Sequence, residues 1–241
     1  MAVYTRSRPF AGKTQQIEDQ YNQFWSHAAA AADVEAYLRG TPDHQYAAPH
    51  PKWLRASTPF TRWEGRELAE SAHALLIGNR ASFDAAQYPG RPEQAGMSMV
   101  HILAIPKAGL FNGVSLTPRT AGLLDEMMSF FRSCWARPRF RHEVLLHQRL
   151  AIERRDAERP DPDAYRTAME HFRELQAVID DLTPDDFTFG LHLWPDHSVG
   201  HLHLHILATP DRCRKYSTYA HDAKTKDAME VRDFIRSRSG A

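Results

Sequence analysis

Three histidines, His201, His203 and His205, stand at alternate positions in one short stretch of the chain. The residues after them are leucine, leucine and isoleucine. Alternation with a period of two is typical of a β-strand whose two faces differ. We therefore expect the three imidazoles on one face of a strand and the aliphatic side chains in a core. Packing alone explains three histidines on one face poorly, so this strand is where we look for chemistry.

Imidazole is largely neutral near pH 7, so one ring nitrogen can attack an electrophile while the other is held as a hydrogen-bond donor. Phosphorus is a natural electrophile for it, and the resulting phosphohistidine-type intermediate can be split by water. The sequence has no GxxxxGK phosphate-binding loop, and no acidic residue lies inside the histidine stretch. We interpret any phosphate chemistry here as histidine chemistry rather than magnesium-and-lysine chemistry.

A metal site is the main rival interpretation. A strand rises about 3.3 Å per residue, so His201 and His205 would lie roughly 13 Å apart along the backbone. Zinc holds its nitrogen ligands at about 2.0–2.1 Å, so all three imidazoles would converge only by leaning strongly. A pair could still share a metal, and simple solvated strand histidines are a second alternative. We predict no metal ligands and no cofactor.

Composition limits the other classes of function. The chain has 241 residues, with 30 basic and 30 acidic side chains that cancel, so binding to extended nucleic acid gets little support. No apolar run approaches the ~20 residues of a membrane helix, and the basic N-terminus lacks the apolar core of a secretory signal. Its two cysteines, Cys134 and Cys213, favour a reduced, cytoplasmic compartment.

We interpret the N-terminal part, residues 1–72, as a helical extension. Apolar residues at helical spacing predict a helix over 14–39, and a second, short helix is predicted over 64–71. Strands are predicted over 73–77 and 98–105, joined through a Pro- and Gly-containing loop.

Residues 137–182 read as an enlarged helical insertion, with helices over 139–155 and from Asp161 onward. Before it, Thr117 and Pro118 suggest the start of another helix. After it come a strand over 186–193, the histidine strand and a C-terminal helix over 223–237. No strong linker separates two cores, so we predict a single domain over 1–241.

The stretch from His201 to Leu207 resembles the histidine triad motif, His-φ-His-φ-His-φ-φ with φ apolar, of the histidine triad (HIT) superfamily. The run over 190–200, GLHLWPDHSVG, is similar to the segment before the triad in the HINT-like branch of that superfamily. HILAIPK, over 101–107, is similar to an earlier strand of the same proteins. The resemblance covers about residues 73–110 and 185–210, well under half of the chain.

The resemblance implies an α+β fold with a HIT-like antiparallel sheet of about five strands and packed helices. The N-terminal, inserted and C-terminal helices are additions to it. The implied activity is that of a nucleotide hydrolase or nucleotidyl transferase, acting on the α-phosphorus of a nucleoside phosphoramidate or phosphoanhydride. The implied partner is a small nucleotide substrate, and a homodimer is a further expectation.

The resemblance also implies roles for single residues. His203 would be the nucleophile that forms a covalent nucleotidyl-histidine, and His201 would orient it through a backbone carbonyl. His205 would lie near the phosphate and the leaving group. The resemblance implies that His101 and Ser198 bind the substrate, and we predict His192 as a further substrate-binding residue.

One departure from the branch lies after Lys107. Many HINT proteins have a histidine just after this Pro-Lys pair, whereas Ala108 and Gly109 follow here. This departure and the added helices leave two alternatives open. The chain could be a HIT-fold protein that binds a nucleotide or a partner without turnover, or a repurposed enzyme that acts on another metabolite.

Overall fold

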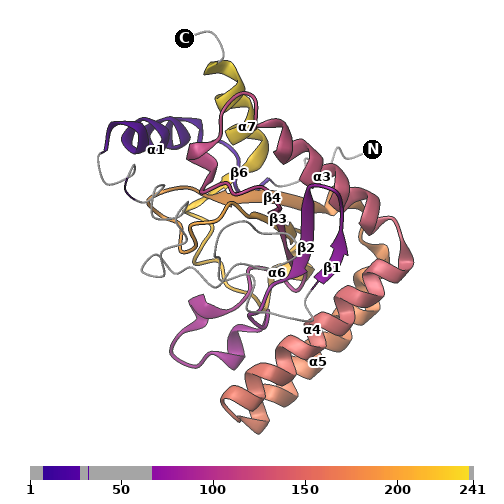
Figure 1. Ribbon diagram of the computed structural model, residues 1–241. Helices are drawn as coiled ribbons and strands as arrows, with labels where there is room; N and C mark the ends of the chain where they lie inside the picture. The colour runs from indigo at the N-terminus through magenta and orange to yellow at the C-terminus, as the bar shows by residue number, and fades with distance from the viewer. Residues whose placement is uncertain (1–7, 28–31, 33–66, 239–241) are drawn as a thin grey trace, which may run out of the picture.

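The computed structural model describes residues 8–27, 32 and 67–238, and within them the fold is α+β with one antiparallel sheet (Figure 1). The sheet has six strands in the order β1-β2-β3-β5-β4-β6. They are β1 Glu67–Glu70, β2 Ala74–Gly78, β3 His101–Pro106, β4 Phe187–His192, β5 Leu204–Ala208 and β6 Thr225–Asp227. The predicted α+β class and antiparallel sheet are confirmed, with one strand more than the expected five.

The two edge strands differ from the sequence-based expectation. Residues 67–70, predicted within a short helix, form β1 and pair with β2. So short a segment gains little as an isolated helix, whereas pairing with a buried strand satisfies its backbone groups. Residues 225–227, predicted as helix, form β6 beside β4.

The helices lie mostly where periodicity predicts them, and their ends differ. They are α1 Thr14–Ser26, α3 Gly122–Trp135, α4 Pro138–Glu158, α5 Pro162–Val178, α6 Asp211–Arg214 and α7 Ala228–Ser237. Short 3₁₀ turns are found at Ala85–Gln87, Pro92–Gln94, Gly113–Ser115, Ile179–Asp181 and Pro184–Asp186. The prediction of one continuous helix over 14–39 is wrong, because the backbone of His27 is extended. Residues 28–31 and 33–39 lie outside the described residues.

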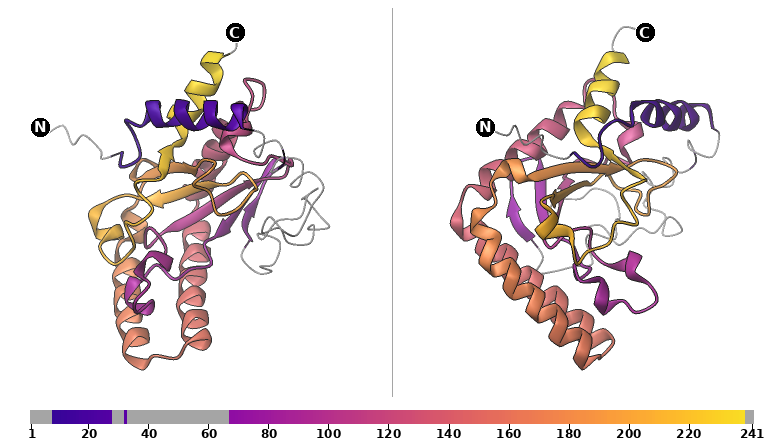
Figure 2. Two further views of the ribbon diagram at one scale, coloured as in Figure 1. Left: turned by 90° about the vertical axis from the view of Figure 1, so that its left-hand side faces the viewer. Right: turned by 180° about the vertical axis from the view of Figure 1, so that it is seen from behind.

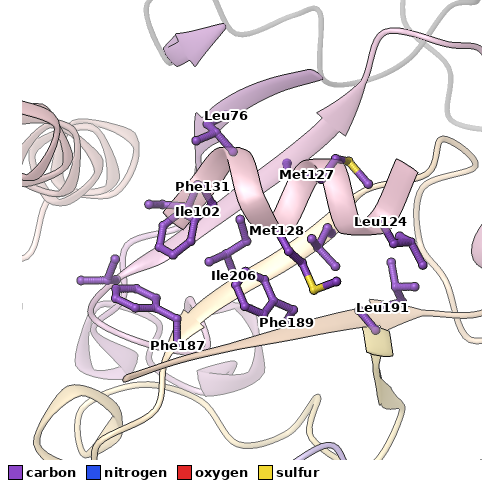
Figure 3. Close-up of a cluster of buried hydrophobic side chains, with 14 of the residues drawn as sticks. Leu76, Ile102, Leu124, Met127, Met128, Phe131, Phe187, Phe189, Leu191 and Ile206 are labelled. Carbon is purple, nitrogen blue, oxygen red and sulfur yellow. The ribbon is translucent and has the colours of Figure 1, made fainter. Parts of the chain in front are cut away.

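Helix α3 packs across one face of the sheet and forms the centre of the core (Figure 3). Its residues Leu124, Met128 and Phe131 are buried at helical spacing, so one stripe of the helix faces the strands. Phe189 of β4 and Ile206 of β5 point into the same core. The aliphatic residues Leu204 and Ile206 therefore bury one face of β5, and His205 lies on the opposite face together with Leu207.

Helices α4 and α5 form an antiparallel hairpin that projects beyond the sheet (Figure 2). Asp161 caps α5 by accepting a hydrogen bond from the Ala164 N–H, and Pro162 occupies the first turn. The hairpin lies within residues 137–182, the region interpreted as an insertion. None of the helices described is long and apolar enough to cross a membrane.

Candidate functional site

The three histidines of the motif do not share one strand, which corrects the sequence-based expectation. Strand β5 begins at Leu204, so only His205 belongs to the sheet. The Leu202 N–H donates to the carbonyl of Leu110 rather than to a neighbouring strand. The ring of His201 is fully buried, and its Nε2 donates to the carbonyl of Pro106 at 3.1 Å. The chain thus enters the sheet only at Leu204, and His201 and His203 lie before the strand.

His203 is held in one tautomer by the backbone. Its Nδ1 lies 2.7 Å from the carbonyl oxygen of His201, and a carbonyl only accepts, so Nδ1 carries the proton. The lone pair is then on Nε2. Burial lowers the pKa of His203 to about 4, although the His201 carbonyl raises it. The imidazole is therefore neutral near pH 7, and a lone pair on its Nε2 has the chemistry of a base or a nucleophile.

A hydrogen-bonded chain sets the tautomer of His205. The Met97 N–H (3.3 Å) and the Asn79 amide (2.9 Å) both donate to His101 Nδ1, so His101 carries its proton on Nε2. That N–H donates to His205 Nδ1 at 2.9 Å. Neutral His205 consequently has its proton on Nε2, and this buried atom has no hydrogen-bond partner in the described structure. An unsatisfied buried donor is costly unless a ligand accepts from it.

His192 completes the cluster from the end of β4. Its ring centroid lies 4.2 Å from that of His205. The Thr225 hydroxyl donates to the carbonyl of His221 at 2.7 Å, so it accepts from His192 Nε2 at 3.0 Å. Burial lowers the pKa of His192 to about 2. The lone pair of His192 is on Nδ1.

Burial keeps the whole cluster neutral. It lowers the pKa of His101 to about 3 and holds that of His205 well below its usual value. His192, His203 and His205 each keep about 7% of their surface exposed, whereas His201 keeps none. These three residues are therefore nearly buried, the Nε2 of His205 is itself buried, and His201 contributes only its backbone carbonyl.

Ser198 lies apart from this arrangement. It is exposed in the turn that leads from β4 into the motif, and within the described structure its side chain makes no hydrogen bond to the four imidazoles. The structure thus brings together His101, His192, His203 and His205, and it leaves Ser198 exposed at the surface.

Sequence reasoning missed several residues of the site. Asn79 follows β2 and orients His101, while Thr225 orients His192 from β6. Lys224 precedes Thr225, and its positive charge further lowers the pKa values of His192 and His203. Each of these residues is far in sequence from the motif and follows no periodic pattern, so spacing alone had no signal for them.

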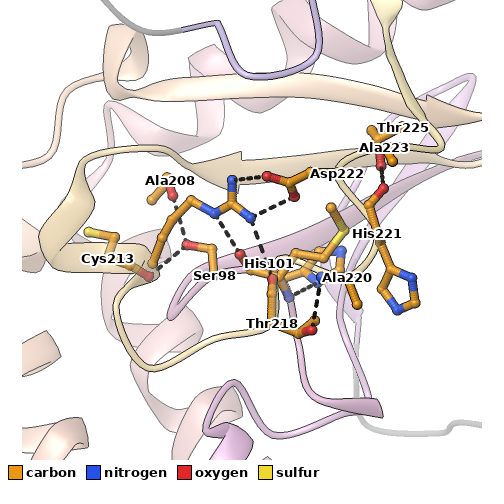
Figure 4. A network of polar contacts seen from close by, with 12 residues as sticks. Ser98, His101, Ala208, Cys213, Thr218, Ala220, His221, Asp222, Ala223 and Thr225 are labelled. Atoms are coloured by element: carbon orange, nitrogen blue, oxygen red, sulfur yellow. Dashed lines mark hydrogen bonds and ion pairs between the residues drawn. The ribbon is translucent and has the colours of Figure 1, made fainter. Parts of the chain in front are cut away.

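A buried arginine anchors the loops around the cluster (Figure 4). Arg214 Nε donates to the Met97 carbonyl at 3.0 Å, and its terminal nitrogens pair with both oxygens of Asp222 at 2.9 and 2.7 Å. Met97 in turn donates its N–H to His101. Arg214 therefore joins the loop before β3 to the segment that carries His221 and Lys224.

Within the described ranges, no group of three or more His, Cys, Asp or Glu side chains is arranged to hold a metal ion. No family model matches the chain, and no curated protein matches it. The fold and the site therefore define its class by themselves. It is an α+β protein whose antiparallel sheet carries a buried cluster of four neutral, hydrogen-bonded histidines.

Proposed function

We propose that the chain is a histidine triad enzyme with a HIT-type fold, which hydrolyses or transfers a nucleotidyl group through a covalent nucleotidyl-histidine. Its substrate is a nucleoside phosphoramidate or a nucleotide phosphoanhydride. The observation that carries the proposal is the pairing of two adjacent imidazoles with opposite tautomers. His203 offers a lone pair on Nε2, and His205 offers an unsatisfied N–H on its own Nε2.

In the first step, His203 Nε2 attacks the α-phosphorus and a phosphorus–nitrogen bond forms. The bond from phosphorus to the amine nitrogen, or to the bridging oxygen of the anhydride, breaks, and the leaving group takes the electron pair. An amine leaving group also takes one proton from solvent, and His205 keeps its own proton. In this proposal the His205 Nε2–H, which has no partner in the described structure, donates a hydrogen bond to a phosphoryl oxygen or to that leaving group. Such preorganised donors stabilise developing charge without reorganisation cost.

In the second step, water attacks the same phosphorus and the bond to His203 breaks. The ring leaves with its electron pair on Nε2, one water proton is released, and the product is a nucleoside monophosphate. Another acceptor in place of water gives nucleotidyl transfer. Since Nδ1 stays bonded to the His201 carbonyl throughout, the same tautomer is regenerated.

The other residues act around this pair. His101 is a positioning residue, because it acts on substrate only through His205. His192 and Lys224 lie beside the two reactive imidazoles and suit a phosphate or an anionic leaving group. Ser198 would contact the substrate only if the bound substrate extends over the turn between β4 and the histidine motif.

The test is turnover of adenosine phosphoramidate and of a dinucleoside polyphosphate by His203→Ala. We expect a loss of at least about a thousandfold on whichever substrate the parent uses. The parent, mixed with substrate and quenched without acid, should carry one nucleotidyl group on His203 by mass spectrometry. His142→Ala, an exposed histidine of α4, is the matched control and should be fully active.

Retained turnover in His203→Ala would reject the assigned nucleophile. Protection of the parent by nucleotides in thermal unfolding, with no product over hours, would favour the binding protein without turnover. Loss of activity on adding a chelator would favour the metal-dependent alternative.

A further inference from the structure

A cavity lined by Asn79 lies next to the histidine cluster, because the Asn79 amide also donates to His101. It measures about 280 Å³ and opens between the loop after β2 and the last turns of α4. Helix α4 contributes Arg154, Arg155 and Glu158 to it, and the loop contributes Tyr88 among others. Figure 2 shows this loop beside the helical hairpin. The volume is below the range of about 300–1,000 Å³ usual for whole metabolites, so it suits a small group.

The lining of this cavity is strongly positive. Three arginines, Arg80, Arg154 and Arg155, face it together with a single carboxylate, that of Glu158. Glu158 pairs with Arg80 at 2.7 Å. Burial lowers the pKa of Arg154, and the neighbouring charge of Arg80 lowers it further, which indicates that the cations are crowded. An anion in the cavity would relieve this repulsion.

Arg155 is held in place by two contacts, and the N–H groups of its terminal nitrogens are not used by them. Its Nε donates to the carbonyl of Gln87 at 3.0 Å, and its guanidinium lies 4.6 Å from the centre of the Tyr88 ring. Its two terminal nitrogens donate to no other residue of the described chain. The Tyr88 oxygen accepts from the Ser82 N–H at 2.9 Å, which leaves its own proton for a further acceptor. A rigid, planar guanidinium with unused N–H groups matches the oxygens of a phosphate.

We propose that this cavity is a binding site for a free phosphate-type dianion, held by Arg155 and Arg154 and closed by Tyr88. The site is separate from the histidine cluster, and it does not depend on the proposed reaction. Asn79 forms the shared wall, because it lines the cavity while its amide donates to His101.

The test is calorimetric titration of the full chain with inorganic phosphate and with pyrophosphate. We expect saturable binding of one anion that weakens as sodium chloride is raised. Arg155→Gln should weaken it about tenfold or more, because hydrogen bonds to charged groups are lost. Arg149→Gln is the matched control: it removes the same charge from an exposed position of α4 and should change affinity less than about twofold.

Two further variants keep the outcome decisive if Arg155→Gln unfolds. Glu158→Gln removes the carboxylate from the lining and should tighten binding about two- to threefold, which a damaged fold would not do. His203→Asn should leave binding unchanged. Absence of saturable binding, unchanged affinity in both Arg155→Gln and Glu158→Gln, or loss of binding in His203→Asn alone would overturn the proposal.

Discussion

His101 Nε2 lies 2.9 Å from His205 Nδ1, and this single hydrogen bond determines which nitrogen of His205 carries the proton. His101 is itself oriented by the Met97 N–H and the Asn79 amide. Backbone and side-chain donors thus assign the tautomers through two rings in succession. The outcome is an N–H on His205 beside a lone pair on His203, whose ring centroid is 4.8 Å away.

Replacing His101 tests this relay. His101→Leu removes both the acceptor for Met97 and the donor to His205, so we expect the free energy of unfolding to fall by about 1–3 kcal/mol. We also expect kcat/KM for the nucleotide substrate to fall about a hundredfold, because His205 no longer keeps one tautomer. His101→Gln can accept through its oxygen and donate through its nitrogen, so it should recover part of both losses. Equal activity of the Leu variant and the parent would contradict the relay.

Acid should destabilise the protein through the same cluster. The pKa is lowered to about 2 for His192, about 3 for His101 and about 4 for His203, from about 6.5 in an unfolded chain. Below pH 6.5 the unfolded chain therefore binds more protons than the folded one. As the pH is lowered from about 6.5 to about 4, the free energy of unfolding should fall by up to about 1.4 kcal/mol per pH unit for each histidine. Above pH 7 these histidines should not contribute to its pH dependence.

Urea unfolding between pH 4 and 8 measures this dependence. His192→Asn should make the slope shallower, whereas His142→Ala, at an exposed position, should leave it unchanged. A slope that is equal in parent and His192→Asn would show that the cluster does not control acid stability.

Gly190 is required for the close approach of β4 and β6. A Cβ at this position would lie 2.4 Å from Thr225 Cγ2 and 3.1 Å from the ring of Phe10. Gly190→Ala should therefore displace Thr225, which holds His192, and cost about 1–3 kcal/mol of stability. At Gly122, in α3, a Cβ would meet nothing closer than 3.8 Å, so Gly122→Ala should be neutral or stabilising by up to about 1 kcal/mol. Thermal unfolding of the two variants provides the comparison.

The ion pair between Arg214 and Asp222 is expected to contribute to the stability of the protein. Arg214→Met leaves the carboxylate without its partner and the Met97 carbonyl without its donor. We expect a loss of about 1–3 kcal/mol, less than for a fully buried ion pair because the Asp222 side chain is 26% exposed. In Arg214→Met/Asp222→Asn the unpaired charge is gone, so the double variant should lose less than the sum of the two single variants. Additive losses in urea unfolding would mean that the two side chains are not coupled.

The sequence by itself determined the elements whose signal is local. Hydrophobic periodicity and the Asp161-Pro162 start predicted α5 closely, and alternation predicted β4, because both signals depend on neighbours along the chain. The motif around His203 also indicated His205, and the structure brings the two ring centroids to 4.8 Å from each other.

Only the tertiary structure decided which imidazoles meet and which nitrogens carry protons. β6 exists because its backbone pairs with β4, far away in the chain, and β1 exists because it pairs with the buried strand β2 that follows it. The local pattern of three or four residues cannot indicate either pairing. His101, His192 and His205 come from three strands that the sheet order places side by side. Their tautomers follow from Met97, four residues before His101, and from Asn79 and Thr225, which lie 22 and 33 residues away from the histidines they contact. The hydrogen bonds of Asn79 and Thr225 form only once the chain has folded.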